Sequence, residues 1–167
     1  MRVFVKCLVF CCMFFATACT VNYSFSGVDI APEIKSVSVK TFKNNASLVN
    51  LKLANELTNK LKEKFLSQTK LIVTDQGGDL QFEGQITQYA VSATAVGSDK
   101  ASLNRLTITV RVRFENSLDP KKNYDTQFSR YADFSSSQTL EQVQDALVAE
   151  IVEALVDDIF SKAVTNW

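Results

Sequence analysis

The residues that could carry chemistry in this sequence are few and unevenly placed. All the cysteines lie in the first nineteen of 167 positions (Cys7, Cys11, Cys12 and Cys19), and the chain contains no histidine. Without histidine, the Ser-His-Asp and Cys-His mechanisms and every histidine-dependent metal site are excluded. A disulfide framework or a cysteine-rich zinc site in the body of the chain is excluded as well, because the later residues include no cysteine.

Residues 1–18 have the pattern of a secretory signal peptide, which is removed on export. Arg2 and Lys6 supply the positive start, residues 8–15 are continuously apolar, and small residues follow at 16–18. The apolar run is shorter than the ~20 residues that a membrane-spanning helix needs. A buried N-terminal strand is the alternative, but the basic residues before the run fit a signal peptide better.

The small residues directly before Cys19 resemble the lipobox of bacterial lipoproteins, in which the cysteine is acylated and becomes the first mature residue. Ala16 stands where the lipobox usually has leucine. Ordinary cleavage after Ala18 is the alternative, but it would leave a lone exposed thiol at the new terminus. We therefore expect a covalent lipid on Cys19, no cofactor, a tether over residues 19–33 and a single domain over 34–167.

A second pattern that could do chemistry is a set of arginines, three at alternating positions on one predicted strand and a fourth on the last strand. Guanidinium groups bind phosphate through two hydrogen bonds at once, so these arginines are candidates for an anionic ligand site. The alternative is a solvated strand face on which they pair with Glu83 or Asp125 across neighbouring strands. The candidate ligand-binding residues are Arg105, Arg111, Arg113 and Arg130.

Acidic residues give no catalytic or metal signature. Asp157 and Asp158 are adjacent on a predicted helix and point ~100° apart, so they cannot jointly hold one ion. We expect both carboxylates to be solvated. The sequence has no nucleophile elbow and no glycine-rich phosphate loop, and it predicts neither a catalytic residue nor a metal ligand.

Alternating apolar and polar residues predict the strands that position these side chains. Apolar and polar residues alternate in three long segments, as in strands with one dry face. The first segment starts near residue 80, and the other two span 105–114 and 124–134. Shorter strands are predicted at 34–42 and 71–73. The long strands favour an antiparallel meander, which the first strand can join as a parallel neighbour through a helical crossover.

Two amphipathic helices are predicted as well. The first has about five turns, with Ser47 as its cap and apolar residues at a spacing of four. The second, over residues 137–164, begins at a capping box formed by Thr139 and Gln142. The predicted fold is therefore α+β, with two helices packed on one face of a four- to five-stranded mixed, mostly antiparallel sheet. The apolar face of the first helix consists of Leu53, Leu57, Leu61 and Phe65.

The charge balance limits the kinds of partner. The chain has 18 basic and 18 acidic residues. Removal of residues 1–18 takes away Arg2 and Lys6 and no acidic residue, which leaves 16 basic and 18 acidic residues. Because there is no basic excess, nucleic-acid binding is not expected.

Four stretches stand in a distinctive order along the mature chain. They are CTVNYSFSG from Cys19, KSVSV from Lys35, LNRLTITV from Leu103 and FSRYADF from Phe128, followed by the closing helix. Together they resemble the LPS-assembly lipoprotein family, LptE. The resemblance covers essentially the whole mature chain and includes the order strand, helix, strands, helix.

Members of that family are anchored by lipid in the inner leaflet of the outer membrane and sit as a plug inside the β-barrel of their partner, LptD. The two together insert lipopolysaccharide into the outer leaflet. The resemblance implies the same partner, the periplasmic face of the outer membrane, and lipopolysaccharide as a candidate ligand. The chain departs from the better-known branch at Thr20 and Val21, where that branch has glycine and an aromatic residue. The residue after Cys19 is not aspartate, so the usual inner-membrane retention signal is missing.

Two hypotheses for function remain open. The first is a non-enzymatic plug and assembly factor for an outer-membrane barrel. The second is a free-standing outer-membrane lipoprotein that binds an envelope or anionic ligand through its polar sheet face. Aromatic residues could contact a barrel wall, although we favour core or edge packing for most of them. These aromatic residues are Tyr23, Phe25, Tyr131, Phe134 and Trp167.

Overall fold

The computed structural model describes residues 30–48, 50–94 and 102–165. The predicted signal peptide, Cys19, Tyr23, Phe25 and Trp167 lie outside these residues. Of the helices in the described part, neither has the combination of length and hydropathy that is needed to span a bilayer. The elements in chain order are β1 (Ser36–Val39), β2 (Lys43–Asn44), α2 (Leu53–Gln68), β3 (Ile72–Thr74), β4 (Leu80–Ala93), β5 (Leu103–Asn116), the 3-10 turn η1 (Pro120–Lys122), β6 (Tyr124–Ser135) and α3 (Leu140–Thr165).

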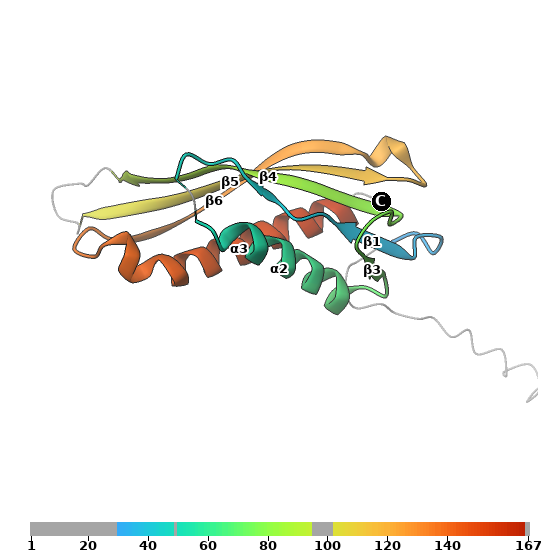
Figure 1. The fold of residues 1–167 in the computed structure, drawn as a ribbon, viewed down its shortest axis with the longest axis horizontal. Coiled ribbons are helices and arrows are strands. Elements are labelled where there is room, and N and C mark those ends of the chain that lie inside the picture. Colours follow the sequence, from blue (N-terminus) through green and yellow to red (C-terminus); the bar gives the residue numbers. More distant parts are fainter. Residues whose placement is uncertain (1–29, 49, 95–101, 166–167) are drawn as a thin grey trace, which may run out of the picture.

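The strands form one mixed sheet in the order β3-β1-β4-β5-β6, with β2 pairing beside β4. Strands β4, β5 and β6 form the predicted antiparallel meander. Strand β1 lies parallel to both β3 and β4, and α2 provides the crossover between β1 and β3. The α+β class and the mixed, mostly antiparallel sheet are thus confirmed (Figure 1). The sheet has six strands, because the two-residue β2 adds one to the predicted number.

The predicted first strand, residues 34–42, is broken at Phe42, whose ring turns into the core. Phe42 is buried and lies against Gly84, where an added Cβ would overlap the ring. Because Gly84 has no side chain, the ring fills the space on the helix side of β4. Directly after Phe42 the chain resumes pairing with β4 as β2, where Lys43 lies opposite Gln85.

Strand β4 contains a bulge that the alternation did not predict. The pairing with β5 shifts by one residue between Ile86 and Gln88. Before the shift, even-numbered residues such as Phe82 and Ile86 face the core, and after it the odd-numbered Tyr89 does. A single inserted residue, Thr87, therefore keeps the dry face continuous along a 14-residue strand.

Helix α2 starts later than predicted, and Ser47 does not cap it. The Asn50 Oδ1 atom accepts hydrogen bonds from the backbone N–H groups of Lys52 (3.0 Å) and Leu53 (3.3 Å). An asparagine just before the first turn satisfies the amides that have no partner within the helix. At α3, Gln142 Oε1 accepts a hydrogen bond from the Thr139 N–H (3.0 Å), which is one half of the predicted capping box.

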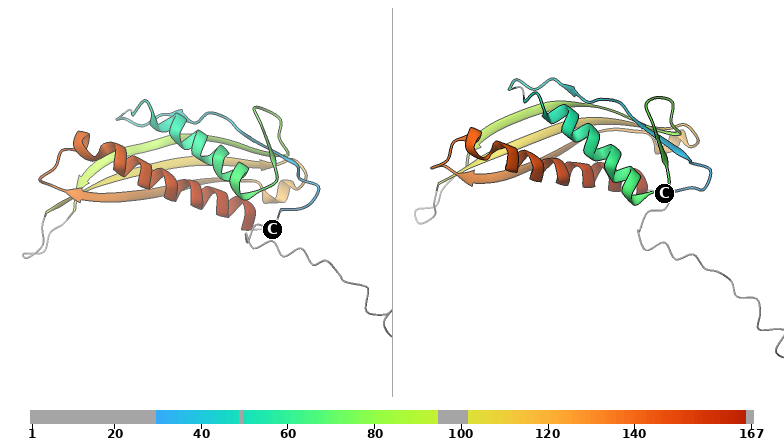
Figure 2. Two further views of the ribbon diagram at one scale, coloured as in Figure 1. Left: turned by 90° about the horizontal axis from the view of Figure 1, so that it is seen from below. Right: turned by 60° about the horizontal axis from the view of Figure 1, so that its bottom comes forward.

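Both helices pack on the same face of the sheet, and the core lies between the two layers (Figure 2). The predicted apolar face of α2 is fully buried there, as are the inward residues of β5. A row of aromatic rings crosses this core from α3 to β6, with neighbouring centroids 4.9–5.2 Å apart. The rings belong to Phe160, Phe65, Phe82, Phe114 and Tyr124.

The adjacent carboxylates of α3 are ion-paired, contrary to the expectation that both are only solvated. Asp157 pairs with Lys64 of α2 at 2.6 Å, and Asp158 pairs with Arg130 of β6 at 2.5 Å. Adjacent helical side chains point in different directions, so each carboxylate reaches a different neighbour. The two pairs thus connect α3 to the other helix on one side and to β6 on the other.

Candidate functional site

Among the described elements, no helix covers the second face of the sheet (Figure 2). This face carries the candidate arginines of β5. The strand register arranges its side chains in rows that cross the sheet. Two adjacent rows of this face differ in charge: one alternates between basic and acidic residues, and the other has basic residues without a carboxylate of its own. An anion would be attracted to the second row.

The first row alternates in sign across four neighbouring strands or their extensions. Glu83 of β4 lies opposite Arg113 of β5, which lies opposite Asp125 of β6. Lys40, at the end of β1, completes the row with an ion pair to Glu83. Each basic residue thus has an acidic neighbour, which is the favourable arrangement for cross-strand charges. Arg113 also pairs with Glu115 along its own strand at 2.5 Å.

The second row contains two basic residues and no carboxylate. Lys43 of β2 lies beside Gln85, which lies opposite Arg111, which lies opposite Gln127. Arg111 reaches diagonally to Asp125 in the first row, with Nε–Oδ1 and Nη2–Oδ2 distances of 2.7 and 2.9 Å. Among the described residues, the positive charge of this row is therefore balanced by carboxylates of the first row, through the ion pair of Arg111 with Asp125 and the longer-range attraction between Lys43 and Glu83.

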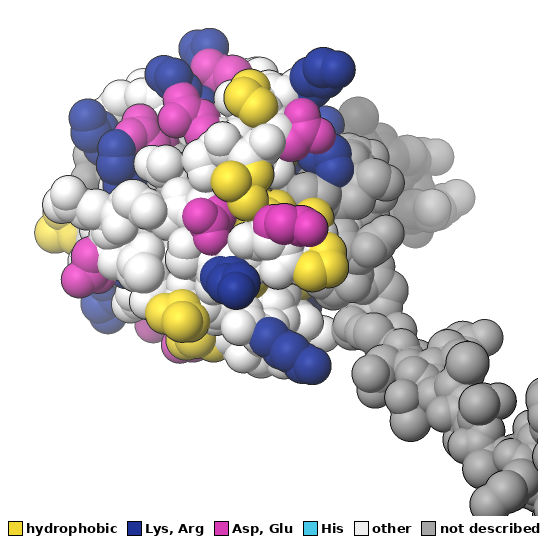
Figure 3. Space-filling view, turned by 90° about the vertical axis from the view of Figure 1, so that its right-hand side faces the viewer, with side chains coloured by type: hydrophobic (Ala, Val, Ile, Leu, Met, Phe, Trp, Pro, Cys, Tyr) yellow, Lys and Arg dark blue, Asp and Glu magenta, His cyan; other side chains and the backbone are white. Residues whose placement is uncertain are grey.

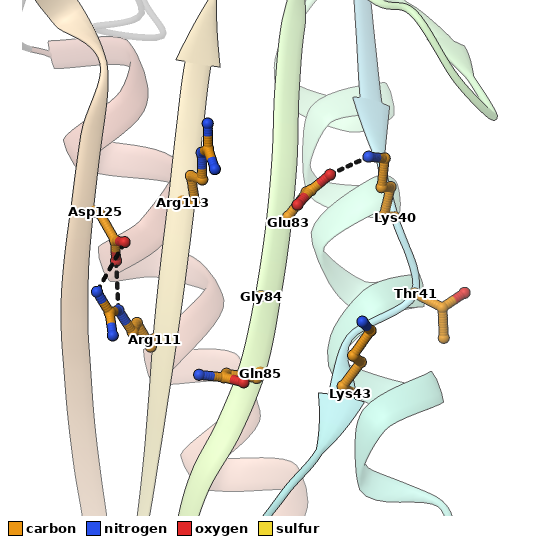
Figure 4. Close-up of a pocket in the computed structure, with 9 residues that line it drawn as sticks. All are labelled: Lys40, Thr41, Lys43, Glu83, Gly84, Gln85, Arg111, Arg113 and Asp125. Carbon is orange, nitrogen blue, oxygen red and sulfur yellow. Dashed lines mark hydrogen bonds and ion pairs between the residues drawn. The ribbon is translucent and has the colours of Figure 1, made fainter.

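Between the rows the surface is hollowed, with a volume of about 380 Å³ (Figure 4). We call this hollow the basic depression. Four of its lining residues are basic and two are acidic, so its balance is positive. Figure 4 shows the lining residues on β4, β5, the β1–β2 segment and, for Asp125, β6, on both sides of Gly84. The charged lining residues are Lys40, Lys43, Arg111, Arg113, Glu83 and Asp125.

The ion pairs hold the acidic residues of the basic depression in their charged form. The Arg111 guanidinium, which donates two hydrogen bonds to Asp125, lowers the pKa of that carboxyl group. The Lys40 ammonium likewise lowers the pKa of Glu83. Both acidic side chains are therefore charged at neutral pH and compete with any anionic ligand for the same cations.

The structure brings Arg111 and Arg113 together but places Arg105 outside the basic depression. Arg105 donates two hydrogen bonds to Asp133, at 2.7 and 2.8 Å, and lies 3.6 Å from the centre of the Tyr131 ring. This pairing lowers the pKa of Asp133. Arg105 thus has a carboxylate and an aromatic ring as partners on the same face.

Arg130 lies on the opposite face of the sheet, so the expectation that it could join the other arginines is wrong. It is paired with Ile108, a core residue, in the β5–β6 register, and its side chain binds Asp158 of α3. Because strand residues alternate between faces, Arg130 belongs with the helix side. It helps to dock α3.

The sequence did not single out Lys40, Lys43 or Gln85 as part of a site. Lys40 lies within the predicted strand 34–42, whereas no strand was predicted at Lys43. The parallel pairing of β2 with β4 brings Lys43 beside Gln85, and this pairing has no local sequence signal.

The remaining candidates have structural partners or lie outside the described residues. Phe134 is buried, as favoured for most of the aromatics, whereas Tyr131 is 56% exposed beside Arg105. Within the part of the chain that the structure describes, no three acidic or cysteine side chains come close enough to hold a metal ion.

The fold and the uncovered polar face define an α+β domain with a one-sided helical layer. Hypothetical protein CT253 from Chlamydia trachomatis is similar, with a TM-score of 0.52, 12% identity, and coverage of 79% of this chain and 99% of that chain. A minor lipoprotein from Acinetobacter baumannii gives a TM-score of 0.49 at 13% identity, covering 75% of this chain and 89% of that one. No curated protein sequence matches.

The family is decided by sequence. Residues 34–163 match the family model for LptE, described as lipopolysaccharide-assembly. The chain therefore belongs to the LptE family of lipopolysaccharide-assembly proteins, and the resemblance drawn from its motifs is confirmed.

Proposed function

We propose that this chain is a non-enzymatic lipoprotein of the outer membrane, held at the periplasmic face by a lipid on Cys19, and that it acts as plug and assembly partner of a β-barrel of the LptD type. The observation that carries the proposal is the family match, which runs through nearly all of the described domain. The one-sided helical layer supports it. Stability resides on the helix side, so the other sheet face is available for a partner or ligand.

The same proposal assigns lipopolysaccharide binding to the basic depression. Lipid A carries phosphate groups, and Lys43 and Arg111 stand in the row that has no carboxylate of its own. A phosphate bound there would replace Asp125 as the partner of the Arg111 guanidinium, which is suited to bidentate binding of phosphate.

Copurification tests the partnership. A plug is expected to leave detergent extracts in a one-to-one complex with a large barrel, and its level is expected to fall when the barrel is absent. Recovery of the chain as a free lipoprotein at an unchanged level would favour the second hypothesis, a free-standing binder of an envelope anion.

Charge reversal tests the ligand site. The double variant Arg111→Glu/Arg113→Glu is expected to lose lipopolysaccharide binding, whereas Arg105→Glu, on the same strand and face but outside the basic depression, is the matched control. Full binding by the double variant would reject the site.

Anchoring is tested at the N-terminus. Replacing Cys19 with alanine is expected to move the protein from the membrane fraction to the soluble fraction, because no acyl chain can then be attached. Unchanged partitioning would contradict the lipid anchor.

A further inference from the structure

A second hollow lies at the end of the molecule where the described chain begins. Its walls come from residues 30–35, the end of α2 with the turn that follows, and the first residue of β3, and its volume is about 640 Å³. We call it the N-terminal hollow. Of its eleven lining residues, six are apolar, two are lysines and none is acidic. The apolar ones are Ile30, Ala31, Pro32, Ile34, Leu71 and Ile72.

The walls of the N-terminal hollow are joined by hydrogen bonds of the backbone. The Ile72 N–H donates to the Lys35 carbonyl oxygen at 2.9 Å, which connects the start of β3 to the segment before β1. At the end of α2, the Thr69 hydroxyl donates to the Phe65 carbonyl oxygen at 2.6 Å and accepts from the Leu71 N–H at 3.1 Å. The three segments that form the hollow are therefore held in place by the fold.

Large apolar side chains reach the surface at this end. Ile72, in the lining, is 67% exposed, and Leu66, one residue before the lining begins on α2, is 58% exposed. Figure 3 looks onto this end of the molecule, where hydrophobic side chains reach the surface between basic and acidic ones. An exposed apolar patch with polar residues around it marks a contact site for a membrane or for another protein.

The two lysines give the N-terminal hollow a positive charge. Lys70 is exposed and, within the part of the chain that the structure describes, has no ion pair. Asp79 offsets part of the charge of Lys35, since its Oδ2 atom accepts hydrogen bonds from the N–H groups of Lys35 (2.9 Å) and Ser36 (3.0 Å). Glu33 is exposed in the same segment but does not line the hollow. Lys70 therefore supplies the uncompensated charge of the lining.

The N-terminal hollow is also the part of the described domain that lies nearest to Cys19 along the chain. Ile30, which belongs to the lining, is the first described residue and lies eleven positions after Cys19. A chain of that length reaches at most about 40 Å. With a lipid on Cys19, as proposed above, the bilayer surface is therefore within reach of the hollow.

We propose that the N-terminal hollow docks on the surface of a bilayer that contains anionic phospholipid, with Ile72 entering the headgroup layer and Lys70 beside the lipid phosphates. The inference rests on the proposed lipid anchor and adds an orientation to it, in which the end of α2 and β3 faces the membrane. Basic residues are attracted to anionic lipids, and exposed apolar side chains insert at the interface. The anchor makes the membrane, rather than another protein, the partner that we assign.

The orientation is measured on the mature chain coupled to lipid. Once residues 1–18 are removed, Cys19 is the only cysteine, so it can be attached to a maleimide-bearing lipid whether or not the cell acylates it. The coupled chain is bound to vesicles of phosphatidylcholine, alone or mixed with phosphatidylglycerol, that carry a fluorescence quencher in the headgroup layer. Trp167, the single tryptophan, is replaced by phenylalanine, so that each variant carries one tryptophan at a chosen position.

Ile72→Trp and Leu51→Trp form a matched pair, because both replace exposed aliphatic side chains and lie beyond opposite ends of α2. Side chains at an interface sink roughly 5–10 Å into the headgroup and acyl boundary. On vesicles with phosphatidylglycerol, Ile72→Trp is therefore expected to lose severalfold more of its emission to the quencher than Leu51→Trp. Equal quenching of the two variants, or no quenching of Ile72→Trp, would overturn the proposal.

Lys70→Glu in the Ile72→Trp chain tests the role of charge. It is expected to shift the docking equilibrium roughly tenfold toward the undocked state, since one lysine near an anionic surface changes affinity about fivefold and charge reversal adds repulsion. The matched control is Lys52→Glu, an exposed lysine at the other end of α2, which is expected to leave the quenching unchanged. Equal effects of the two variants would contradict the proposal. The assay contains neither barrel nor lipopolysaccharide and supplies the lipid chemically, so failure of the proposed function would not change its result.

Discussion

The two faces of the sheet are built from the same strands but are governed by different physics. On the helix side, residues such as Ile108 and Val110 are fully buried, and stability there comes from the removal of apolar surface from water. On the uncovered side, their immediate neighbours are polar: Thr107 is partly exposed to solvent, and Arg111 forms an ion pair with Asp125. Residues one position apart along β5 therefore face different surroundings: one is buried in the core, and the other lies on the face to which we assign ligand binding.

The largest expected difference in stability between the two faces is tested at two neighbouring positions on β5. Ile108→Ala is expected to lower the free energy of unfolding by ~2–5 kcal/mol, because a buried side chain leaves a cavity. Thr107→Ala, on the other face, is expected to change it by less than ~0.5 kcal/mol. Urea denaturation of the two variants measures the difference. Similar losses for both would mean that the uncovered face also belongs to the core.

The contact between Phe42 and Gly84 predicts the next largest effect. Gly84→Ala is expected to cost ~1–3 kcal/mol of unfolding free energy, because the new methyl group overlaps the Phe42 ring.

A double variant checks that cause. In Phe42→Ala/Gly84→Ala the overlap disappears, so the two changes together are expected to cost less than the sum of the single effects. If the two losses of unfolding free energy were additive, the overlap with the Phe42 ring would not be the cause of the effect of Gly84→Ala.

These elements show where sequence reasoning succeeds and where it stops. The face of α2 and the meander followed from periodicity, because burial selects apolar residues at the period of each element. The break at Phe42 and the bulge at Thr87 depend on contacts between distant segments, so no local sequence pattern predicts them.

The candidate site was predictable in part for the same reason. Alternation along β5 correctly placed Arg111 and Arg113 on one face, and the cross-strand partner Asp125 had been considered. Arg130 was misplaced because the β5–β6 register, which fixes its face, is not encoded within β6 alone. Lys43 was missed because its row exists only once β2 pairs with β4.

The ion pair between the helices is expected to have a smaller effect. Asp157→Asn removes the partner of Lys64 and is expected to cost at most ~1 kcal/mol, because both side chains are partly exposed. A double-mutant cycle with Lys64→Met isolates the pair energy. A coupling well above that range would indicate a larger role for the pair in docking α3 on α2.

The smallest effect concerns acid titration on the uncovered face. Because Arg111 lowers the pKa of Asp125 below its unfolded value of 3.8, the pair contributes fully above that pH and its contribution is lost as the pH falls through the folded-state pKa. Asp125→Asn is therefore expected to be slightly less stable than the wild type at neutral pH. The two urea midpoints are expected to converge in acid, once the pH has fallen below the lowered folded-state pKa of Asp125. A difference that persists in acid would exclude titration of Asp125 as its cause.

The central claim is that the uncovered face binds lipopolysaccharide through the row of basic residues that lacks its own carboxylate. Its most direct test is the affinity of purified Lys43→Glu and Lys40→Glu for lipopolysaccharide, since both lysines line the basic depression but only Lys40 is paired with Glu83. We expect a loss of roughly tenfold for Lys43→Glu and a clearly smaller loss for Lys40→Glu, because a charge-assisted contact to phosphate is worth about 1.5–3 kcal/mol. Equal losses, or unchanged binding in Lys43→Glu, would contradict it.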